Sequence, residues 1–516
     1  MSICLYGPSG TGKTTVGRLL AQQLNMTWFD LDVEIEKEAG QSIETMFRIL
    51  GEPVFRELES ATLDQLLKAD PSSVISLGGG ALLNNQNRLL AESYGPVVLL
   101  SASIDTLVAR LTADTVVRPL VKEDPRQRLT DLLVRRSEHY ASIGKPVVTD
   151  HLTPEEIVHE IQIRIGKFQV HGMDKTYDIL VQPGILNHLG KSLKERGIHG
   201  PAALVCDQNI EPLYADRVKE SLRSAGIEAT KIVIAAGEEN KTIQTVSVIW
   251  EGFLSAGVER GSVVIALGGG VTGDLTGFAA ATYLRGVPWV NVPTSLLAMV
   301  DSSLGGKTGA DLPQGKNLIG AFHAPLLVLS DPEVLSTLPP SELHSGLAET
   351  IKHGIIADQT LYDQCAAGWP QNINDSTELI SRAIAVKVEI ITADPYEKGL
   401  RQSLNLGHTI GHGVEKASNY QLSHGECVAI GMIAEARLAE SINIADSGLS
   451  EKLAEDFTKI GLPTKIPAEL DRHEIINATL LDKKRSGKQI HFALPQRIGK
   501  VQIGLVVEDW QNRIIW

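Results

Sequence analysis

Short apolar runs and helical periodicity alternate along the first third of the chain. Residues 3–6 (ICLY) form an apolar run that leads into a glycine-rich loop, and the apolar residues of 16–24 then recur on one helix face. Further apolar runs at 74–77 and 97–100 each follow a helical stretch. Such alternation is typical of buried parallel strands, so the pattern predicts an α/β domain.

The end of this domain has the features of a helix boundary. Thr153 is suited to be an N-cap and Pro154 to be the first helical residue, and periodicity then continues to Ile165. The segment 166–175 (GKFQVHGMDK) follows this helical stretch and is the expected junction between domains. We therefore expect the first domain to end near residue 166, followed by a linker.

The remaining chain changes its pattern once. Apolar runs at 204–206, 232–234, 263–267 and 289–292 predict a second α/β layer, whereas the chain from about residue 339 is mostly helical in periodicity. The helical segments are expected at 343–356, 377–393 and 428–441, before a short hairpin at 490–494 and 500–507. The predicted organisation is an α/β domain at 1–166, a linker at 167–176, an α/β domain at 177–337 and a mostly helical domain at 338–516.

Composition places the chain among soluble globular proteins. It has 516 residues, of which 43% are apolar and 21% charged. No apolar run reaches the roughly 18–20 residues needed to span a bilayer, and the N-terminus lacks the pattern of a signal peptide. Four widely spaced cysteines (Cys4, Cys206, Cys365 and Cys427) argue against a disulfide framework or a thiolate zinc site. These features predict a cytoplasmic protein.

The formal net charge of −14 limits which kinds of ligand the protein is expected to bind. A nucleic-acid-binding protein needs a basic footprint, which this balance does not supply. An acidic protein also repels small anions on average. Any phosphate or carboxylate site must therefore be built from local clusters of Lys, Arg and backbone N–H groups.

The first such cluster is GPSGTGKT, residues 7–14, which matches the P-loop pattern GxxxxGK[ST]. Its glycines let backbone N–H groups turn around phosphate oxygens, Lys13 neutralises phosphate charge, and the Thr14 hydroxyl is a Mg²⁺ ligand. The required strand precedes it and the required helix follows it. The motif predicts a nucleoside triphosphate site but does not identify the acceptor.

Residues that could bind an acceptor follow in order. Asp30 and Asp32 stand two apart at the end of an expected strand, so both are expected on the same side, one near Mg²⁺ and the other near a substrate hydroxyl. Further along come Arg56, the glycines Gly78, Gly79 and Gly80, then Arg118 and Arg136.

These motifs together resemble shikimate kinase, of the nucleoside monophosphate kinase fold, over roughly residues 1–165. The resemblance implies that Arg118 lies on a lid over the transferring phosphate and that Arg110 lies near adenine. Where the family often has RxPLY, this chain has RSEHY, which leaves Arg135 and Arg136 as alternatives. The resemblance implies nucleotide binding by Gly7, Gly10, Thr11, Gly12, Lys13, Thr14 and Thr15, and shikimate binding by Asp32, Arg56, Gly78, Gly79, Gly80 and Arg136. Asp32, Lys13 and Arg118 are implied as catalytic residues, and Thr14 and Asp30 as Mg²⁺ ligands.

A second glycine cluster (LGGGVTGD, residues 267–274) follows an expected strand and opens an expected helix, as a pyrophosphate site does. Upstream, Asp207 ends an apolar run, where a carboxylate can bind ribose hydroxyls. Downstream, residues 293–322 gather Asp301 and several lysines among glycines. The pattern predicts dinucleotide binding beside an anion site.

The helical segments contribute a candidate metal site. Glu349 and Lys352 lie three apart on one helix face, and His408, His412 and His424 follow. A carboxylate with two histidines makes a three-ligand set that leaves a coordination position open, the catalytic zinc arrangement. Spacing alone does not decide between His408 and His412.

These motifs, spread over roughly residues 170–510, resemble 3-dehydroquinate synthase. The resemblance implies Zn²⁺ or Co²⁺ on Glu349, His408 and His424. It implies NAD⁺ binding by Asp207, Glu238, Lys241, Gly269, Gly270, Asp274, Thr294, Ser295, Lys307 and Lys316. It implies substrate binding by Asp301, Lys307, Asn317, Lys352, Lys387, Arg401, Asn405, His412 and Lys488, of which Lys352, Arg401 and His412 are also catalytic. Arg285 is implied to reach a neighbouring subunit's substrate, which implies a homodimer.

Three functions are compatible with these motifs. The first is a bifunctional enzyme that phosphorylates shikimate with ATP and converts 3-deoxy-D-arabino-heptulosonate 7-phosphate to 3-dehydroquinate and phosphate with NAD⁺ and a metal. The second joins another small-molecule P-loop kinase to a glycerol-dehydrogenase-like enzyme, although an uncharged polyol does not need the phosphate-binding lysines. The third makes the P-loop domain a nucleotide sensor, which has no use for a carboxylate clamp.

Overall fold

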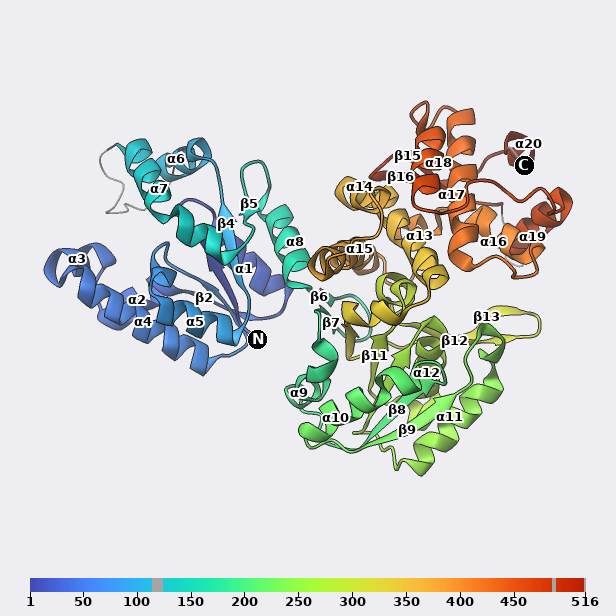
Figure 1. Ribbon diagram of the computed structural model, residues 1–516, viewed down its shortest axis with the longest axis horizontal. Helices are drawn as coiled ribbons and strands as arrows, with labels where there is room; N and C mark the ends of the chain where they lie inside the picture. The colour runs from blue at the N-terminus through green and yellow to red at the C-terminus, as the bar shows by residue number, and fades with distance from the viewer. Residues whose placement is uncertain (114–123, 485–488, 515–516) are drawn as a thin grey trace. The chain divides into compact units, whose positions relative to one another are not determined.

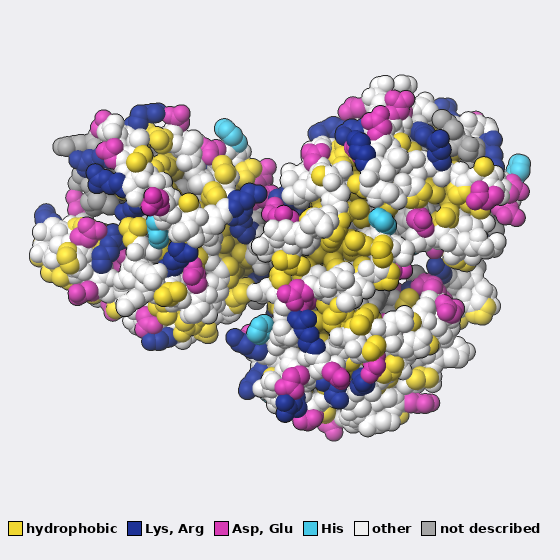
Figure 2. All heavy atoms as spheres, viewed as in Figure 1, with side chains coloured by type: hydrophobic (Ala, Val, Ile, Leu, Met, Phe, Trp, Pro, Cys, Tyr) yellow, Lys and Arg dark blue, Asp and Glu magenta, His cyan; other side chains and the backbone are white. Residues whose placement is uncertain are grey.

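The computed structural model describes residues 1–113, 124–484 and 489–514. It divides into two compact units, 1–165 and 166–516. Among the described residues, none of the helices is both long and apolar enough to cross a bilayer. On the face drawn in Figure 2, basic and acidic side chains are interspersed.

The first unit is built on a parallel sheet with the strand order β2-β3-β1-β4-β5 (Figure 1). Successive residues of a strand point to opposite faces, so β1 contributes to two cores. Cys4 and Tyr6 pack against α2, α4 and α7, whereas Ile3 and Leu5 pack against α1 and α8. The strands are β1 Ile3–Tyr6, β2 Thr27–Asp30, β3 Ser73–Ser76, β4 Val97–Ser101 and β5 Val147–Val148. The helices are α1 Lys13–Gln23, α2 Leu31–Ala39, α3 Ile43–Ile49, α4 Gly51–Ala69, α5 Asn85–Tyr94, α6 Ile104–Ala113, α7 Pro125–Ile143 and α8 Pro154–Ile165.

Most expected elements of this unit are confirmed, with one correction of geometry. Helix α8 has the predicted bounds, and its Thr153 hydroxyl accepts a hydrogen bond from the Glu156 backbone nitrogen at 3.2 Å. The expectation that Asp30 and Asp32 project from the same side of a strand is wrong. Asp30 ends β2, whereas Asp32 already belongs to helix α2. The Asp30 carboxylate caps this helix by accepting a hydrogen bond from the Asp32 backbone nitrogen at 3.2 Å.

The second unit begins with a seven-stranded sheet of order β6-β7-β14-β11-β10-β8-β9, in which β6 alone is antiparallel to its described neighbour. Residues 167–176, expected as a linker, begin with strand β6. The strands are β6 Lys167–Val170, β7 Tyr177–Val181, β8 Ala202–Asp207, β9 Ala229–Ile234, β10 Val263–Gly268, β11 Trp289–Pro293 and β14 Leu327–Ser330. The helices are α9 Leu189–Lys194, α10 Asp216–Ser224, α11 Ile243–Ser255 and α12 Gly270–Thr282, and a hairpin of β12 Lys307–Leu312 and β13 Gly315–Phe322 packs near α12.

The rest of this unit is helical, as predicted, and closes with the expected hairpin (Figure 1). Helix α17 packs very closely against the start of helix α16. A β-carbon on Gly431 would lie only 1.9 Å from the Gly407 carbonyl oxygen. Any larger residue at 431 would push the two helices apart. The elements are α13 Pro340–Ala357, α14 Gln359–Ala366, α15 Ile373–Ala393, α16 His408–Ala417, α17 His424–Ser441, α18 Leu449–Lys459, α19 Arg472–Lys484, β15 Phe492–Arg497, β16 Lys500–Leu505 and α20 Trp510–Arg513.

Candidate active sites

The P-loop has the backbone that its sequence requires. Gly7, Gly10 and Gly12 have φ angles of 139°, 89° and 91°, which L side chains rarely adopt. The Lys13 ammonium, at the start of α1, donates to the carbonyl oxygens of Gly7 and Pro8 at 2.7 and 2.9 Å. The loop therefore presents a helix N-terminus and an ammonium together, the arrangement that binds phosphate.

Groups suited to Mg²⁺ and adenine lie next to this loop. The Thr14 hydroxyl donates to the Asp30 carboxylate at 2.7 Å, so the two predicted Mg²⁺ ligands are adjacent. Arg110 donates to the Thr149 carbonyl oxygen at 2.6 Å and lies 3.4 Å from the Gly10 carbonyl oxygen. Thr11 is buried and Thr15 is exposed. Arg118 lies outside the described residues.

The glycine loop after β3 brings the predicted acceptor-binding residues together. Arg136 Nη1 donates to the Gly79 carbonyl oxygen at 2.6 Å, whereas Arg135 is exposed. A β-carbon on Gly80 would lie 2.8 Å from Arg56 Nη2, and one on Gly78 would lie 2.9 Å from Asp32 Oδ1. Two guanidinium groups and a carboxylate thus surround one short loop, as a small hydroxy acid requires.

The sequence analysis missed Glu59 in this site. Glu59 Oε2 accepts a charge-assisted hydrogen bond from Arg56 at 2.7 Å, and its side chain is 2% exposed. Burial raises the pKa of the Glu59 carboxyl, although Arg56 opposes that rise. Its spacing of three residues from Arg56 on one helix was the signal that could have identified it.

In the larger unit, the candidate dinucleotide residues gather at the carboxyl edge of neighbouring parallel strands. Asp207 ends β8 and accepts a hydrogen bond from the Thr272 hydroxyl at 3.2 Å, and Gly269 precedes α12. Thr294, which follows β11, donates its backbone N–H to the carbonyl oxygen of Gly268. A β-carbon on Gly269 would lie 3.7 Å from the Ser295 hydroxyl oxygen. This is the edge at which open α/β sheets bind ligands.

Several of the predicted cofactor and substrate residues pair with one another. The buried Lys241 ammonium lies 2.6 Å from Asp274 and donates to the Asn317 side chain at 2.7 Å. Burial raises the pKa of Asp274, and Lys241 partly offsets that effect. Lys316 lies 3.6 Å from Glu238. Arg285 is exposed, with a φ of 67°.

Two of the predicted substrate residues, Lys387 and Lys352, interact with Asp301. Lys387 donates to its side chain and to its carbonyl oxygen at 2.6 and 2.7 Å. Although burial opposes ionisation, Lys387 and Lys352 hold the pKa of Asp301 well below its usual range. Arg401 is buried against Gly305. Lys307 forms an ion pair with Glu397, and the Glu397 carboxylate also accepts a hydrogen bond from the Asn405 side chain at 3.5 Å. The sequence analysis missed Glu397. Lys488 lies outside the described residues.

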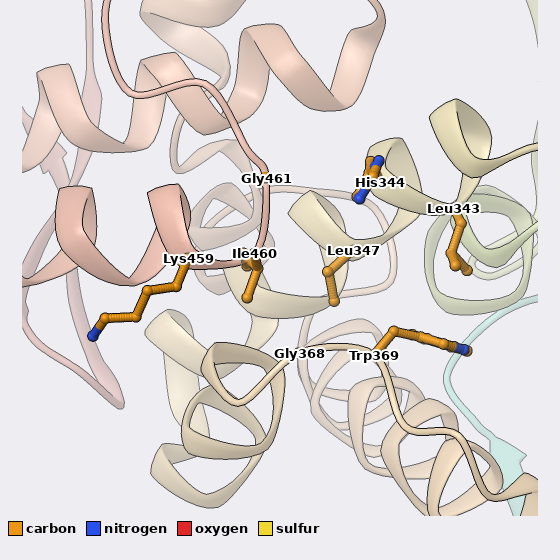
Figure 3. A pocket seen from close by; sticks show the side chains of 8 residues that line it. All are labelled: Leu343, His344, Leu347, Gly368, Trp369, Lys459, Ile460 and Gly461. Atoms are coloured by element: carbon orange, nitrogen blue, oxygen red, sulfur yellow. The ribbon is translucent and has the colours of Figure 1, made fainter.

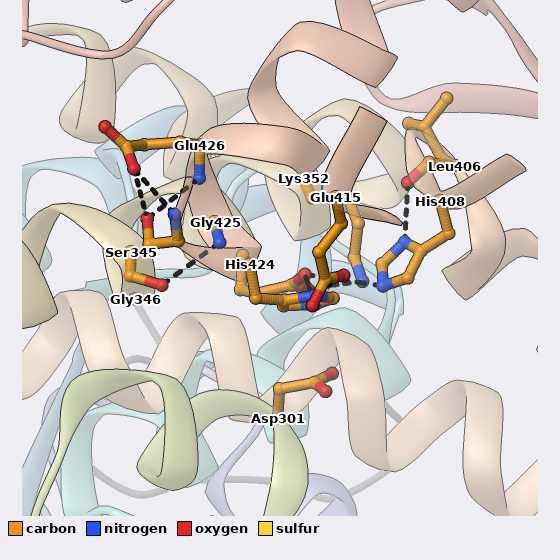
Figure 4. Close-up of polar contacts among 12 residues, drawn as sticks. Asp301, Ser345, Gly346, Lys352, Leu406, His408, Glu415, His424, Gly425 and Glu426 are labelled. Carbon is orange, nitrogen blue, oxygen red and sulfur yellow. Dashed lines mark hydrogen bonds and ion pairs between the residues drawn. The ribbon is translucent and has the colours of Figure 1, made fainter. Parts of the chain in front are cut away.

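Glu349, His408 and His424 form the candidate metal centre (Figure 4). The Nε2 atoms of His408 and His424 lie 3.6 and 3.4 Å from Glu349 Oε1. Both Glu349 oxygens are buried without a regular hydrogen bond from the described residues, and the carboxylate is in ion-pair contact with Lys352. One oxygen and two imidazole nitrogens that converge in this way fit a divalent metal.

The electrostatic surroundings of the two histidines differ. Burial and the nearby Lys352 hold the pKa of His408 well below its usual value, which keeps its imidazole neutral. Burial lowers the pKa of His424, but the carboxylates of Glu349 and Glu415 outweigh it and raise this pKa to about 9. His412 is exposed, with its ring 5.2 Å from that of His408 and 6.1 Å from that of His424.

One hollow in the larger unit does not coincide with these residues. A hollow of about 330 Å³ in the helical part is lined by Leu343, His344, Leu347, Gly368, Trp369, Lys459, Ile460 and Gly461 (Figure 3). None of the predicted site residues lines it. The sites described above are instead held by buried polar contacts around the two glycine loops and Glu349.

Family profiles match both units. The profile of shikimate kinase matches residues 9–165, that of the 3-dehydroquinate synthase N-terminal part matches 231–345, and that of its C-terminal part matches 346–485. The 3-dehydroquinate synthase of Symbiobacterium thermophilum is 42% identical over 339 residues, which cover 64% of this chain and 94% of that protein. The 3-dehydroquinate synthase of Synechococcus sp. is 44% identical over 336 residues, 63% of this chain and 91% of that protein.

Solved structures of related folds also resemble this chain. A crystal structure of 2-deoxy-scyllo-inosose synthase complexed with carbaglucose-6-phosphate, NAD⁺ and Co²⁺ is 26% identical, covers 67% of this chain and 98% of its own, and has a TM-score of 0.60. A butanol dehydrogenase from Thermotoga maritima, 18% identical with a TM-score of 0.51, shares the fold alone. The comparisons therefore favour the first of the three functions over a dehydrogenase of uncharged polyols.

Proposed function

The chain belongs to the 3-dehydroquinate synthase family over its larger unit and carries a shikimate kinase domain in its smaller one, and from this premise we propose which residues serve each reaction. The kinase activity is the phosphorylation of the shikimate 3-hydroxyl by ATP. The synthase activity is the conversion of 3-deoxy-D-arabino-heptulosonate 7-phosphate to 3-dehydroquinate and phosphate. NAD⁺ and Zn²⁺ or Co²⁺ are the cofactors of the synthase, and ATP with Mg²⁺ binds to the kinase.

In the kinase site, Arg56 and Arg136 clamp the shikimate carboxylate beside the Gly78–Gly80 loop. Asp32 orients the 3-hydroxyl and accepts its hydrogen bond, while Lys13 and the P-loop backbone hold the phosphates. Thr14 and Asp30 hold Mg²⁺, which neutralises phosphate charge when bound. The support for this assignment is that Arg136 and Arg56 both contact the glycine loop that also adjoins Asp32.

In the synthase site, Glu349, His408 and His424 hold the metal, which when bound acidifies and polarises the oxygen at the carbon to be oxidised. The residues at the carboxyl edge of β8, β10 and β11 would hold NAD⁺, which when bound would supply the hydride acceptor that the oxidation needs. Lys352, Lys387, Arg401 and His412 position the anionic substrate, and Asp301 keeps Lys387 in place. The observation that carries this assignment is the convergence of both Nε2 atoms on Glu349 Oε1, at 3.6 and 3.4 Å.

The remaining assignments concern assembly and compartment. Arg285 is exposed, so it is available to a neighbouring subunit's substrate phosphate in a homodimer. All four cysteines are buried and free, which suits a reducing cytoplasm.

Assaying both reactions on one purified chain tests this proposal. We expect ADP release with ATP and shikimate, and phosphate release from the heptulosonate phosphate that requires NAD⁺. Chelation should abolish phosphate release, and Zn²⁺ or Co²⁺ should restore it. Phosphorylation of gluconate but not shikimate would refute the kinase assignment, and full synthase activity after complete metal removal would refute the metal site.

A further inference from the structure

Glu415 is a carboxylate that the sequence motifs did not single out, and it links two parts of the larger unit. Its Oε1 accepts a hydrogen bond from the Lys316 ammonium at 2.9 Å, and its Oε2 lies 3.4 Å from His424 Nδ1. Its side chain is 10% exposed. Lys316 belongs to the β12–β13 hairpin and lies over the Tyr420 ring, 4.6 Å from its centroid. The carboxylate therefore joins the hairpin to the helix that carries His424. Figure 4 shows the Glu415 side chain beside His424.

The position of Glu415 matches what a coordinating histidine needs. An imidazole that binds a metal through Nε2 carries its proton on Nδ1 and donates it to an acceptor, which fixes the tautomer and the ring orientation. His408 has such an acceptor in the Leu406 carbonyl oxygen, 3.1 Å from its Nδ1. His424 has the Glu415 carboxylate in the same role. With both Nδ1 atoms so engaged, both Nε2 atoms face Glu349.

The contacts of Glu415 hold its carboxylate in one position. The Lys316 ammonium donates to Glu415 Oε1 at 2.9 Å and also lies 3.6 Å from Glu238, while Glu415 Oε2 faces His424 Nδ1 at 3.4 Å. Glu415 therefore has a lysine ammonium on one side and an imidazole nitrogen on the other, unlike a mobile surface carboxylate.

We propose that Glu415 is a positioning residue of the metal centre, which orients His424 through Nδ1, and that Lys316 holds Glu415 in place from the hairpin. The inference rests on the proposed function, because it takes Glu349, His408 and His424 as the ligands. The competing arrangement is a metal bound by Glu415 itself with His412 and His424, since ligand atoms of these three residues lie within 4.8 Å of one another. The convergence of the Nε2 atoms on the buried Glu349 carboxylate favours positioning.

Metal affinity measures this role directly. The metal-free chain is titrated with Co²⁺ in competition with a chelator, and the visible absorption of bound Co²⁺ is recorded. Glu415→Gln is expected to weaken binding by about 10–100-fold and to change the Co²⁺ spectrum, the usual effect of removing an outer carboxylate. Wild-type affinity with a wild-type spectrum would overturn the proposal.

The chain offers a matched control. Glu415 lies on α16, whereas Glu426→Gln removes one carboxylate from α17, the helix that carries His424. Gln can retain the capping box that Glu426 forms with Ser423. We expect wild-type Co²⁺ affinity for Glu426→Gln, and a loss equal to that of Glu415→Gln would overturn the proposal. The shikimate kinase rate of each variant reports the amount of active chain independently of the synthase unit.

Two further variants separate the proposal from its premise and from the competing arrangement. Glu349→Ala should abolish tight Co²⁺ binding, and His412→Ala should leave it unchanged. If Glu349→Ala binds normally, the proposed metal site fails. If Glu349→Ala loses the metal while Glu415→Gln keeps it, only the role of Glu415 fails. Loss of the metal in His412→Ala would make Glu415 a ligand instead and overturn positioning.

The role of Lys316 has its own test, which also applies if Glu415→Gln does not fold. Lys316→Met changes a partly exposed side chain, and we expect it to weaken Co²⁺ binding less than Glu415→Gln does. If Lys316 acts through Glu415, the double variant should bind no more weakly than Glu415→Gln alone. Fully additive losses, or wild-type Co²⁺ affinity in Lys316→Met, would overturn this part of the proposal.

Discussion

The Glu435 carboxylate accepts a hydrogen bond from the Gly407 backbone nitrogen at 2.6 Å, at the start of the helix that carries His408. Its other oxygen accepts from the Ile410 backbone nitrogen at 3.3 Å, and Glu435 is fully buried. The first N–H groups of a helix have no partner within the helix, and a negative charge there is stabilising. Helix α17 therefore both carries His424 and fixes the start of the helix with His408.

We expect Glu435→Gln to destabilise the larger unit by about 1–3 kcal/mol, because a buried helix N-terminus loses its charged acceptor. Metal affinity should fall as well, since His408 loses its fixed position. Urea unfolding with pulsed proteolysis that scores residues 166–516 separately measures the stability. Glu451→Gln on α18 is the control, because that side chain is exposed. Equal stability of the two variants would contradict the role of Glu435.

Glu435 also shows which part of the site the sequence can reveal. The glycine loops and the order of arginines, lysines and histidines are local patterns, and they predicted the two sites and most of the strands and helices. Glu435 stands 28 residues from Gly407, and Glu415 stands 99 from Lys316. Nothing in the local pattern of either glutamate marks it, because its partner is brought near only by the fold.

Predictions from local sequence periodicity were wrong where one secondary-structure element ends and the next begins. The prediction that Asp30 and Asp32 share one side assumed the two-residue periodicity of a strand. Helix α2 begins at Leu31, between the two residues, so that periodicity does not extend to Asp32. Residues 167–170 (KFQV) alternate polar and apolar side chains, but four residues are too short a run to mark a strand by themselves. Their place in the sheet, at its edge, comes from antiparallel pairing with β7.

The two neighbouring arginines of α7 provide the next prediction. Arg136 reaches the Gly79 carbonyl oxygen, whereas Arg135 is exposed. Arg136→Ala should raise the KM for shikimate by about 10–100-fold, since a charged hydrogen-bond donor to a carboxylate contributes about 1.5–3 kcal/mol. The KM for ATP should change little. Arg135→Ala is the matched control and should behave as the wild type; if it shows the larger effect, Arg135 is the shikimate ligand.

Lys13 tests whether the two reactions use separate residues. Its ammonium lies among the P-loop carbonyl oxygens in the smaller unit, and it has no role in the assigned synthase site. Lys13→Ala should lower the kinase kcat by about 100-fold or more, because a cation aimed at the transferring phosphate is lost. Phosphate release from the heptulosonate phosphate, measured on the same preparation, should keep its wild-type rate. A parallel fall in both rates would contradict this separation.

Asp456 provides a prediction about stability and pH. This buried carboxylate on α18 accepts hydrogen bonds at 2.8 Å from Tyr362, Lys452 and Lys459. Burial raises its pKa, but the three donors outweigh burial and lower the pKa from 3.8 to about 2. A depressed folded-state pKa stabilises the fold above the unfolded-state value, and that stabilisation is lost as the pH falls from about 4 to about 2.

Asp456→Asn should therefore destabilise the larger unit by about 1–2 kcal/mol at pH 7, a figure reduced for the solvent exposure of the two lysines. The difference from the wild type should persist down to about pH 4 and shrink towards pH 3. Urea unfolding with pulsed proteolysis at each pH measures it. Asp363→Asn removes an exposed carboxylate from α14 and should show no comparable loss. A difference between wild type and Asp456→Asn that stays constant from pH 7 to pH 3 would show that the ionised carboxylate is not the source of the stabilisation.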